Sequence, residues 1–349
     1  MGFFMKNIVD IVKIYLGLST VSEIDQINIL NNLVEISTRN KILPIVYDVI
    51  NDNFRNIIHP RLGKSLEILN EHEKNNFKSQ LNELSRLSMD LNNNKINFVV
   101  RKGYSLSRFY KNEFHRAFED IDILIERNDK NKIIQLLDNN KYKEGSFNRY
   151  TMKPTIFDRK DKINYQLLPD HLPHYYKIDN EEYIGSYIVD VAFMLGWFGD
   201  KFNINVRDLL KNRIQVGDTY VLNNWDNFVL TALHLFRETF IFSSAKKMPP
   251  FFRSFIDVYL AFKQVENPIL EFEKCNEALS LCIKRVLELV EQVFETKFTP
   301  FNNIYKEEDL LFCVVNGEQN IYVDISLLDR MSFLTIDEYR NKFSNNLIK

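Results

Sequence analysis

INFVVRKG at residues 96–103 and DIDILI at residues 120–125 are the two segments that decide the fold of the central part of this chain. The first begins as an apolar run, typical of a buried strand, and stops at a Lys-Gly pair, after which a short helical pattern starts. In the second, strand side chains alternate between faces, so Asp120 and Asp122 share one face and the isoleucines enter the core. Two carboxylates beside a glycine turn can hold Mg²⁺ against the phosphates of a nucleotide, which predicts phosphoryl or nucleotidyl transfer.

The turn after the first strand supplies the predicted phosphate side of the site. Gly103 allows close approach of the backbone, and the helix start that follows offers free N–H groups to an anion. Ser105 can add a hydroxyl donor, and Lys102 or Arg116 can add positive charge. Arg116 can equally brace the strand of Asp122 as an ion-pair partner, and both interpretations stay open.

Asp190 is the candidate for a third carboxylate. It lies in an apolar strand, Tyr187–Phe193, where an unpaired carboxylate would be costly and a bound metal would offset that cost. Nucleotidyl transfer builds negative charge on the phosphoryl oxygens, and two Mg²⁺ ions about 3.5–4 Å apart can stabilise the entering and leaving oxygens. Asp190 can complete such a site and accept the proton of the attacking hydroxyl. A salt bridge or a helix cap is the structural alternative for this residue.

Two histidines, His171 and His174, occupy a loop shortly before the strand of Asp190. A metal site built from this pair is conceivable. Histidines in loops more often contact solvent or substrate, so we expect a substrate contact rather than a metal ligand.

The composition of the chain limits the classes of function. With 349 residues and 45% hydrophobic content, the chain is expected to fold into two or three structural units. A formal net charge of -2 gives no electrostatic case for binding nucleic acid. We find no signal peptide and no apolar run long enough to span a bilayer. The three cysteines have no metal-finger spacing, and a cytoplasmic location follows as the default expectation.

The order of helical and extended patterns predicts an α+β fold. We expect a small mixed-sheet core at residues 96–200, between an N-terminal helical region at 1–95 and a C-terminal helical region at 201–296. Residues 297–349 are expected to form a terminal β-hairpin and tail.

Two hairpins are expected from local turn signals. In the terminal region, strands at 311–315 and 321–325 flank Asn316-Gly317, a pair that accepts positive φ and favours a tight turn. In the core, extended stretches at 150–158 and 162–168 flank a polar turn at 159–161.

Together these motifs resemble the bacterial family of uncharacterised nucleotidyltransferases, within the DNA polymerase β-like nucleotidyltransferase superfamily. That family typically shows a Leu-Lys-Gly turn, an arginine four residues before an Asp-x-Asp strand, and an Asp-Leu-His-Trp-like strand. The matching segments here are Val100–Gly103, Arg116–Asp122 and Val189–Phe193, followed by Leu222–Asp226, Ala232–His234 and Arg253–Asp257 and preceded by Lys41–Tyr47. Ala192 stands where the family has its histidine, so the acceptor differs if that histidine binds substrate.

The resemblance implies Mg²⁺-dependent transfer of a nucleoside monophosphate, AMP from ATP first of all, to a small-molecule or peptide acceptor. Relatives of this kind resemble accessory enzymes of natural-product pathways. Two alternatives remain. An RNA-modifying, toxin-type nucleotidyltransferase is disfavoured by the neutral overall charge. A catalytically inactive nucleotide-binding scaffold is disfavoured because all three aspartates are present.

Overall fold

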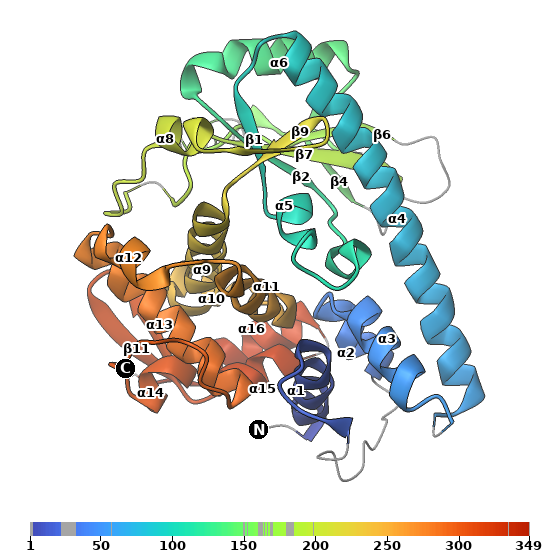
Figure 1. The fold of residues 1–349 in the computed structure, drawn as a ribbon, viewed down its shortest axis with the longest axis vertical. Coiled ribbons are helices and arrows are strands. Elements are labelled where there is room, and N and C mark those ends of the chain that lie inside the picture. The colour runs from blue at the N-terminus through green and yellow to red at the C-terminus, as the bar shows by residue number, and fades with distance from the viewer. Residues whose placement is uncertain are drawn as a thin grey trace. The chain divides into compact units, whose positions relative to one another are not determined.

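The computed structural model describes residues 3–21, 33–56, 58–148, 151, 153–159, 163, 165, 167, 170–178, 185–197, 199–333 and 335–348. The chain forms two compact units. Residues 71–230 form the first, which we call the sheet unit, and residues 1–70 with 231–349 form the second, which we call the helical unit. Figure 1 shows the elements of both units. The expected boundaries at residues 95, 200 and 296 stay a prediction.

In the described part of the chain, the sheet unit contains a seven-stranded mixed sheet of order β3-β6-β7-β2-β1-β9-β8. Its strands are β1 Phe98–Arg101, β2 Ile121–Ile125, β3 Lys143–Glu144, β6 Tyr175–Ile178, β7 Ser186–Ala192, β8 Ile214–Val216 and β9 Thr219–Val221. Strand β2 runs antiparallel to β1 and parallel to β7. The segments at residues 96–103 and 120–125 therefore form adjacent central strands, and the predicted α+β class is confirmed.

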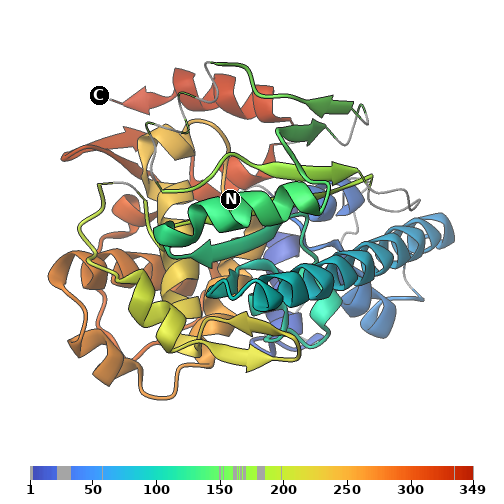
Figure 2. The ribbon, with the colours of Figure 1, turned by 90° about the horizontal axis from the view of Figure 1, so that it is seen from above.

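One face of this sheet carries the core of the unit. Ile121, Ile123 and Ile125 are almost fully buried there, as the alternation of β2 predicts. Helix α4 (Pro60–Asn93) contributes Phe77, Leu84, Leu87 and Leu91 to the same core, and α6 (Lys130–Asn139) contributes Ile133, Leu136 and Leu137. Helix α6 lies over this face in both views of the ribbon (Figures 1 and 2). We call the opposite face the site face. On it lie the other side chains of β1, β2 and β7, including Arg101, Asp122 and Asp190.

The expected hairpin at 150–158 and 162–168 is wrong in its second strand. Strand β5 (Lys153–Thr155) pairs instead with β4 (Ser146–Asn148). The described residues 163, 165 and 167 are helical, and Ile163 and Leu167 have the four-residue spacing of a helix face. Residues 160 and 161 of the expected turn lie outside the described residues.

Further elements among the described residues of the sheet unit are α5 Gly103–Ser107, η2 Glu113–Arg116, η3 Arg127–Asp129 and α8 Val206–Lys211. Helix α9 (Asn224–Phe240) begins in this unit and continues into the helical unit.

The helical unit contains the two ends of the chain. Its other helices are α1 Phe3–Leu16, α2 Leu33–Arg39, α3 Leu43–Asn53, α10 Phe242–Ala245, α11 Phe252–Lys263, α12 Pro268–Glu273, α13 Glu277–Phe294, α14 Glu307–Leu311, α15 Leu327–Ser332 and α16 Ile336–Asn345. Of the helices in the described ranges, none has the length and apolar character needed to cross a membrane.

The expected terminal hairpin is present. Strands β10 (Cys313–Asn316) and β11 (Gln319–Val323) pair antiparallel, and β12 (Leu347–Ile348) extends the sheet along β11. Asn316 lies on β10 opposite Gln319, so the connection is Gly317-Glu318, and Gly317 takes the positive φ of 64°. Glycine suits this position because it has no side chain to clash there.

Candidate active site

The register of three central strands brings the predicted aspartates together on the site face. Asp122 of β2 pairs directly with Asp190 of β7 in the parallel register. Arg101, the last residue of β1, pairs with Asp122 in the antiparallel register. Directly paired residues point to the same side of a sheet, so these three side chains meet. The predicted adjacency of the strands of Asp122 and Asp190 is confirmed.

Two cations lie among these carboxylates. Arg101 Nη2 is 3.3 Å from Asp190 Oδ2 and 3.6 Å from Asp122 Oδ1. Lys102 Nζ donates to the same Asp122 Oδ1 over 3.0 Å. Exposure is 8% for the side chain of Arg101, 2% for Asp122 and 14% for Asp190, so these charges interact with little screening by water.

Arg101 belongs to the candidate site but was not predicted from the sequence, because the predicted positive charge was assigned to Lys102 and Arg116. A signal did exist. Arg101 ends the apolar run of β1, and its side chain lies on the same side of the strand as that of buried Val99. A charged residue in phase with a buried one needs a partner, but the pairing with Asp122 depends on a strand register that one sequence does not reveal.

The cluster leaves one buried donor and one buried acceptor without a partner. Within the described residues, neither Arg101 Nε nor Asp190 Oδ1 has a hydrogen-bond partner. Buried polar atoms are normally paired, because leaving them unpaired costs free energy. The unpaired acceptor fits a cation, and the unpaired donor fits an anion.

The carboxylates are not arranged as a ready metal site. Across the described ranges, no group of three or more His, Cys, Asp or Glu side chains is placed to hold a metal ion. Asp120 lies one residue before β2 and is half-buried, and Arg101 and Lys102 contact the carboxylates of Asp122 and Asp190. The donor chemistry nevertheless fits Mg²⁺, because these are carboxylate oxygens and Asp190 Oδ1 is an unused buried acceptor.

Lys102 has an unusual backbone and a stabilised charge. Its φ of 52° and ψ of -131° place it in a region that non-glycine residues rarely adopt, at a cost of about 1–3 kcal/mol. Burial lowers the pKa of the Lys102 ammonium and is the largest single influence. Attraction to Asp122, with smaller effects of Asp120 and Asp190, outweighs burial and the nearby Arg101, so the pKa lies above its usual value. Lys102 is therefore a cation held against Asp122.

The other residues predicted for the phosphate side take different places. Gly103 begins α5, and a Cβ atom there would come within 3.1 Å of Phe118 Cβ, so a side chain would first meet Phe118. Ser105 is fully buried and its hydroxyl donates to Asn227 Oδ1 over 2.7 Å, which joins α5 to α9. Arg116 is buried and donates from Nη1 to the carbonyl of Ala117 over 3.3 Å. Their predicted roles at phosphate stay predictions.

His171 reaches the site face from a neighbouring segment. It forms an antiparallel bridge with Ala192, flanked by hydrogen bonds from Leu172 N to Val191 O and from Phe193 N to Asp170 O. Ala192 follows Asp190 by two residues and so shares its face, while Leu172 belongs to the core on the other face. His171 Nδ1 is also 3.0 Å from Asp170 Oδ1.

His174 immediately precedes β6, and its carbonyl accepts a hydrogen bond from Gly145 N. The Tyr165 ring lies 5.5 Å from the His171 ring and 6.3 Å from the His174 ring. Strand pairing therefore places His171 opposite Ala192, two residues along β7 from Asp190, and His174 lies between this bridge and the first residue of β6.

The family described as uncharacterised nucleotidyltransferases matches residues 30–282 of this chain. The chain belongs to this family. The protein is therefore an enzyme that transfers nucleotides. The matched region of this nucleotidyltransferase contains the whole site face, including Arg101, Asp122, His171 and Asp190, and it ends before the terminal hairpin. No curated protein matches the chain.

Proposed function

We propose that this nucleotidyltransferase uses Mg²⁺ to transfer a nucleoside monophosphate, AMP from ATP first of all, to a small-molecule or peptide acceptor. One observation carries the proposal. The buried cluster on β1, β2 and β7 has an unpaired acceptor, Asp190 Oδ1, and an unpaired donor, Arg101 Nε. A metal–nucleotide complex brings a cation and phosphate oxygens together, which are the two partners that these atoms lack.

Asp120, Asp122 and Asp190 are the residues that would hold the metal, with two ions during turnover. Bound Mg²⁺ would neutralise charge on the phosphoryl oxygens and orient the triphosphate. Before any metal binds, the three carboxylates exceed the two cations Arg101 and Lys102 by one negative charge. The cluster therefore favours entry of a divalent cation.

The phosphate side of the site is formed by the turn at the end of β1. Lys102 and Arg101 would contact phosphate oxygens, and the backbone at Gly103 would approach them closely. In the free protein Ser105 orients α5 through Asn227. We also propose that the Ser105 hydroxyl and the Arg116 guanidinium contact phosphate, in addition to the contacts made by the turn itself.

The acceptor would approach along the row of Asp190, Ala192 and His171. Asp190 would accept the proton of the attacking hydroxyl. The His171 imidazole, held near Asp170, would orient the acceptor from the segment opposite Ala192. The family has a histidine at the position of Ala192. In this chain His171, which pairs with Ala192, would supply an imidazole next to that position. His174 would contribute less directly.

The test is incubation of the enzyme with each α-labelled nucleoside triphosphate, Mg²⁺ and a panel of metabolites and peptides. Mass spectrometry should detect an added nucleoside monophosphate on one acceptor class, and the addition should stop with EDTA and in Asp122→Asn. Asp129→Asn, which removes an acid paired with Lys132 at the surface, is the matched control and should retain transfer. Transfer that persists in Asp122→Asn or in EDTA would overturn the proposal.

A further inference from the structure

We propose that Arg101 is the resident counterion of the metal site: the divalent ion displaces its guanidinium from Asp122 and Asp190, and the guanidinium then binds nucleotide phosphate. This inference rests on the proposed function, and it adds that the ion and the nucleotide must bind cooperatively. It concerns residues of the sheet unit only, on β1, β2 and β7.

The guanidinium of Arg101 contacts both carboxylates of the proposed metal site. Arg101 Nη2 lies 3.6 Å from Asp122 Oδ1 and 3.3 Å from Asp190 Oδ2. Mg²⁺ binds carboxylate oxygens at about 2.0–2.1 Å. An ion that used both aspartates would therefore draw them closer together and would repel the buried guanidinium strongly.

One donor of Arg101, the buried Nε atom, has no hydrogen-bond partner in the described structure, and Asp190 Oδ1 is in the same state. Other arginines also have one nitrogen in this state, namely Arg39, Arg108, Arg285 and Arg330. Arg101 is therefore singled out by its position between the carboxylates of Asp122 and Asp190. Arg86 in the same unit, by contrast, donates from Nε, Nη1 and Nη2 to Glu83, Asp90 and Asn140. A planar guanidinium with unused donors matches the oxygens of a phosphate group.

The partners of Lys102 make the exchange selective. Lys102 Nζ contacts Asp122 but no contact joins it to Asp190 among the ion pairs described. Displacement of Arg101 thus removes the ion-pair contact of Asp190, while Asp122 keeps a direct contact with the Lys102 ammonium. The released guanidinium belongs to the last residue of β1, next to the turn at Gly103, where the proposed phosphates lie.

The experiment is a titration of Mn²⁺, followed by electron paramagnetic resonance, into the wild-type enzyme, Arg101→Met, Arg101→Lys and the control Arg86→Met. Without nucleotide, Arg101→Met should bind Mn²⁺ about tenfold or more tightly than wild type, since the ion no longer competes with a buried charge-assisted contact. With ATP added, wild type should tighten far more than Arg101→Met. Arg86→Met should match wild type in both titrations.

Arg101→Lys keeps a positive charge with a shorter reach, so its Mn²⁺ affinity should lie between those of wild type and Arg101→Met. If Arg101→Met does not fold, the affinity of Arg101→Lys relative to wild type tests the exchange. Wild-type or weaker Mn²⁺ binding in the Arg101 variants, with wild type still binding Mn²⁺ in the presence of ATP, would overturn the exchange and leave the proposed function standing. No Mn²⁺ binding by wild type even with ATP would overturn both.

Discussion

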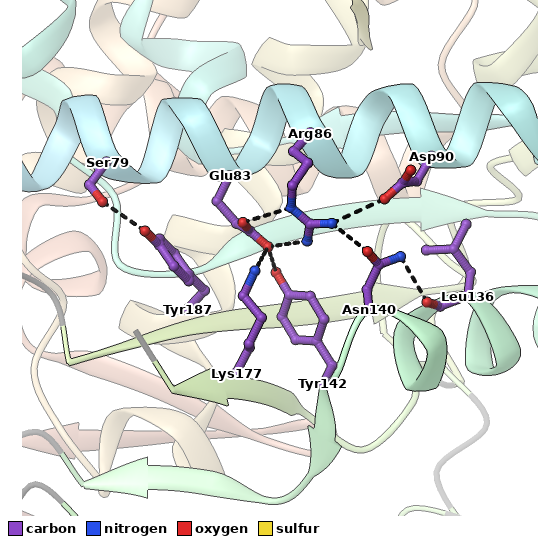
Figure 3. A network of polar contacts seen from close by, with 9 residues as sticks. All are labelled: Ser79, Glu83, Arg86, Asp90, Leu136, Asn140, Tyr142, Lys177 and Tyr187. Atoms are coloured by element: carbon purple, nitrogen blue, oxygen red, sulfur yellow. Dashed lines mark hydrogen bonds and ion pairs between the residues drawn. The ribbon is translucent and has the colours of Figure 1, made fainter. Parts of the chain in front are cut away.

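Two buried carboxylate clusters in the sheet unit differ in how completely their charges are satisfied. Glu83 on α4 accepts from Arg86 Nη2 at 2.6 Å, and from Tyr142 Oη and Lys177 Nζ at 2.5 Å each. Figure 3 shows Arg86 continuing from Glu83 to Asp90 and Asn140. The cluster of Asp122 and Asp190 instead leaves a donor and an acceptor without partners in the described structure.

We infer from this difference that the Glu83 carboxylate has a structural role and that Asp122 and Asp190 have the proposed functional one. The Glu83 cluster joins α4 to β6 and to the segment after α6, and the Ser79–Tyr187 hydrogen bond adds β7 (Figure 3). Burial alone would raise the pKa of Glu83, but hydrogen bonds from Arg86, Lys177 and Tyr142 together lower it. Such a network specifies one packing arrangement and has little capacity for a ligand. The unsatisfied cluster keeps that capacity, at a cost in stability.

The largest expected difference between the two clusters is in the rate of nucleotide transfer after one carboxylate in each cluster is neutralised. Asp122→Asn should reduce the transfer rate by about a thousandfold or more, because metal stabilisation of the transition state contributes several kcal/mol and each 1.36 kcal/mol is tenfold. Glu83→Gln should remain within a few-fold of wild type once folded. Comparable losses in both variants would show that the clusters do not differ in function.

Stability should show the reverse pattern. Glu83→Ala should lower the free energy of unfolding by about 3–5 kcal/mol, because Arg86 and Lys177 lose a buried partner. Urea unfolding followed by circular dichroism measures this. Asp190→Asn should cost far less, since one oxygen of Asp190 already lacks a partner. A larger loss for Asp190→Asn than for Glu83→Ala would contradict the structural role of the Glu83 cluster.

Substitutions of Lys102 test whether its unusual backbone conformation costs stability while its charge serves nucleotide binding. Lys102→Ala and Lys102→Gly should both weaken nucleotide binding by about 1.5–3 kcal/mol, the value of a charge-assisted contact. Glycine accepts the positive φ of this position, so Lys102→Gly should be more stable to urea than Lys102→Ala by about 1 kcal/mol. Equal stability would mean that the backbone at this turn is not strained.

The acceptor side is tested by the two histidines. His171→Ala should lower kcat/KM for the acceptor by about 10–100-fold if it orients the hydroxyl, and should leave nucleotide affinity unchanged. His174→Ala is the matched control and should have the smaller effect. Steady-state kinetics at saturating nucleotide separate the two, and a greater loss in His174→Ala would reassign the acceptor contact.

The smallest expected effect is the pH dependence of the stabilisation that the Glu83 carboxylate provides. The folded-state pKa of Glu83 is below its ordinary value of 4.5, so its stabilisation is present above that pH and is lost as the pH falls through the folded value. The difference in unfolding free energy between wild type and Glu83→Gln should be constant near neutral pH and should shrink below about pH 4.5. A difference that grows on acidification would contradict the sign of this shift.

The sequence predicted the parts of the site that depend on local pattern. Alternation along β2 correctly placed the isoleucines in the core, and the apolar run around Asp190 correctly predicted a strand there. Both features are properties of one segment, so periodicity reveals them. The terminal hairpin followed in the same way from its turn residues.

What the sequence did not predict depends on contacts between distant segments. Arg101 meets Asp122 and Asp190 only through the register of three strands. His171 reaches the site face by a bridge to Ala192, and the Glu83 cluster joins residues 83, 142 and 177. Ser105 was expected at phosphate, but its hydroxyl contacts Asn227, 122 positions later in the chain. No local pattern encodes such pairings.

Isothermal titration of ATP into wild type, Asp190→Asn and Glu83→Gln, with Mg²⁺ and with EDTA, shows directly whether the cluster of Asp122 and Asp190 binds the metal–nucleotide complex. We expect wild type and Glu83→Gln to bind ATP when Mg²⁺ is present and to lose most of that affinity in EDTA. Asp190→Asn should bind weakly under both conditions because the negative charge that attracts the metal ion is gone. Wild-type, Mg²⁺-dependent binding by a folded Asp190→Asn would show that the unsatisfied cluster is not the nucleotide site.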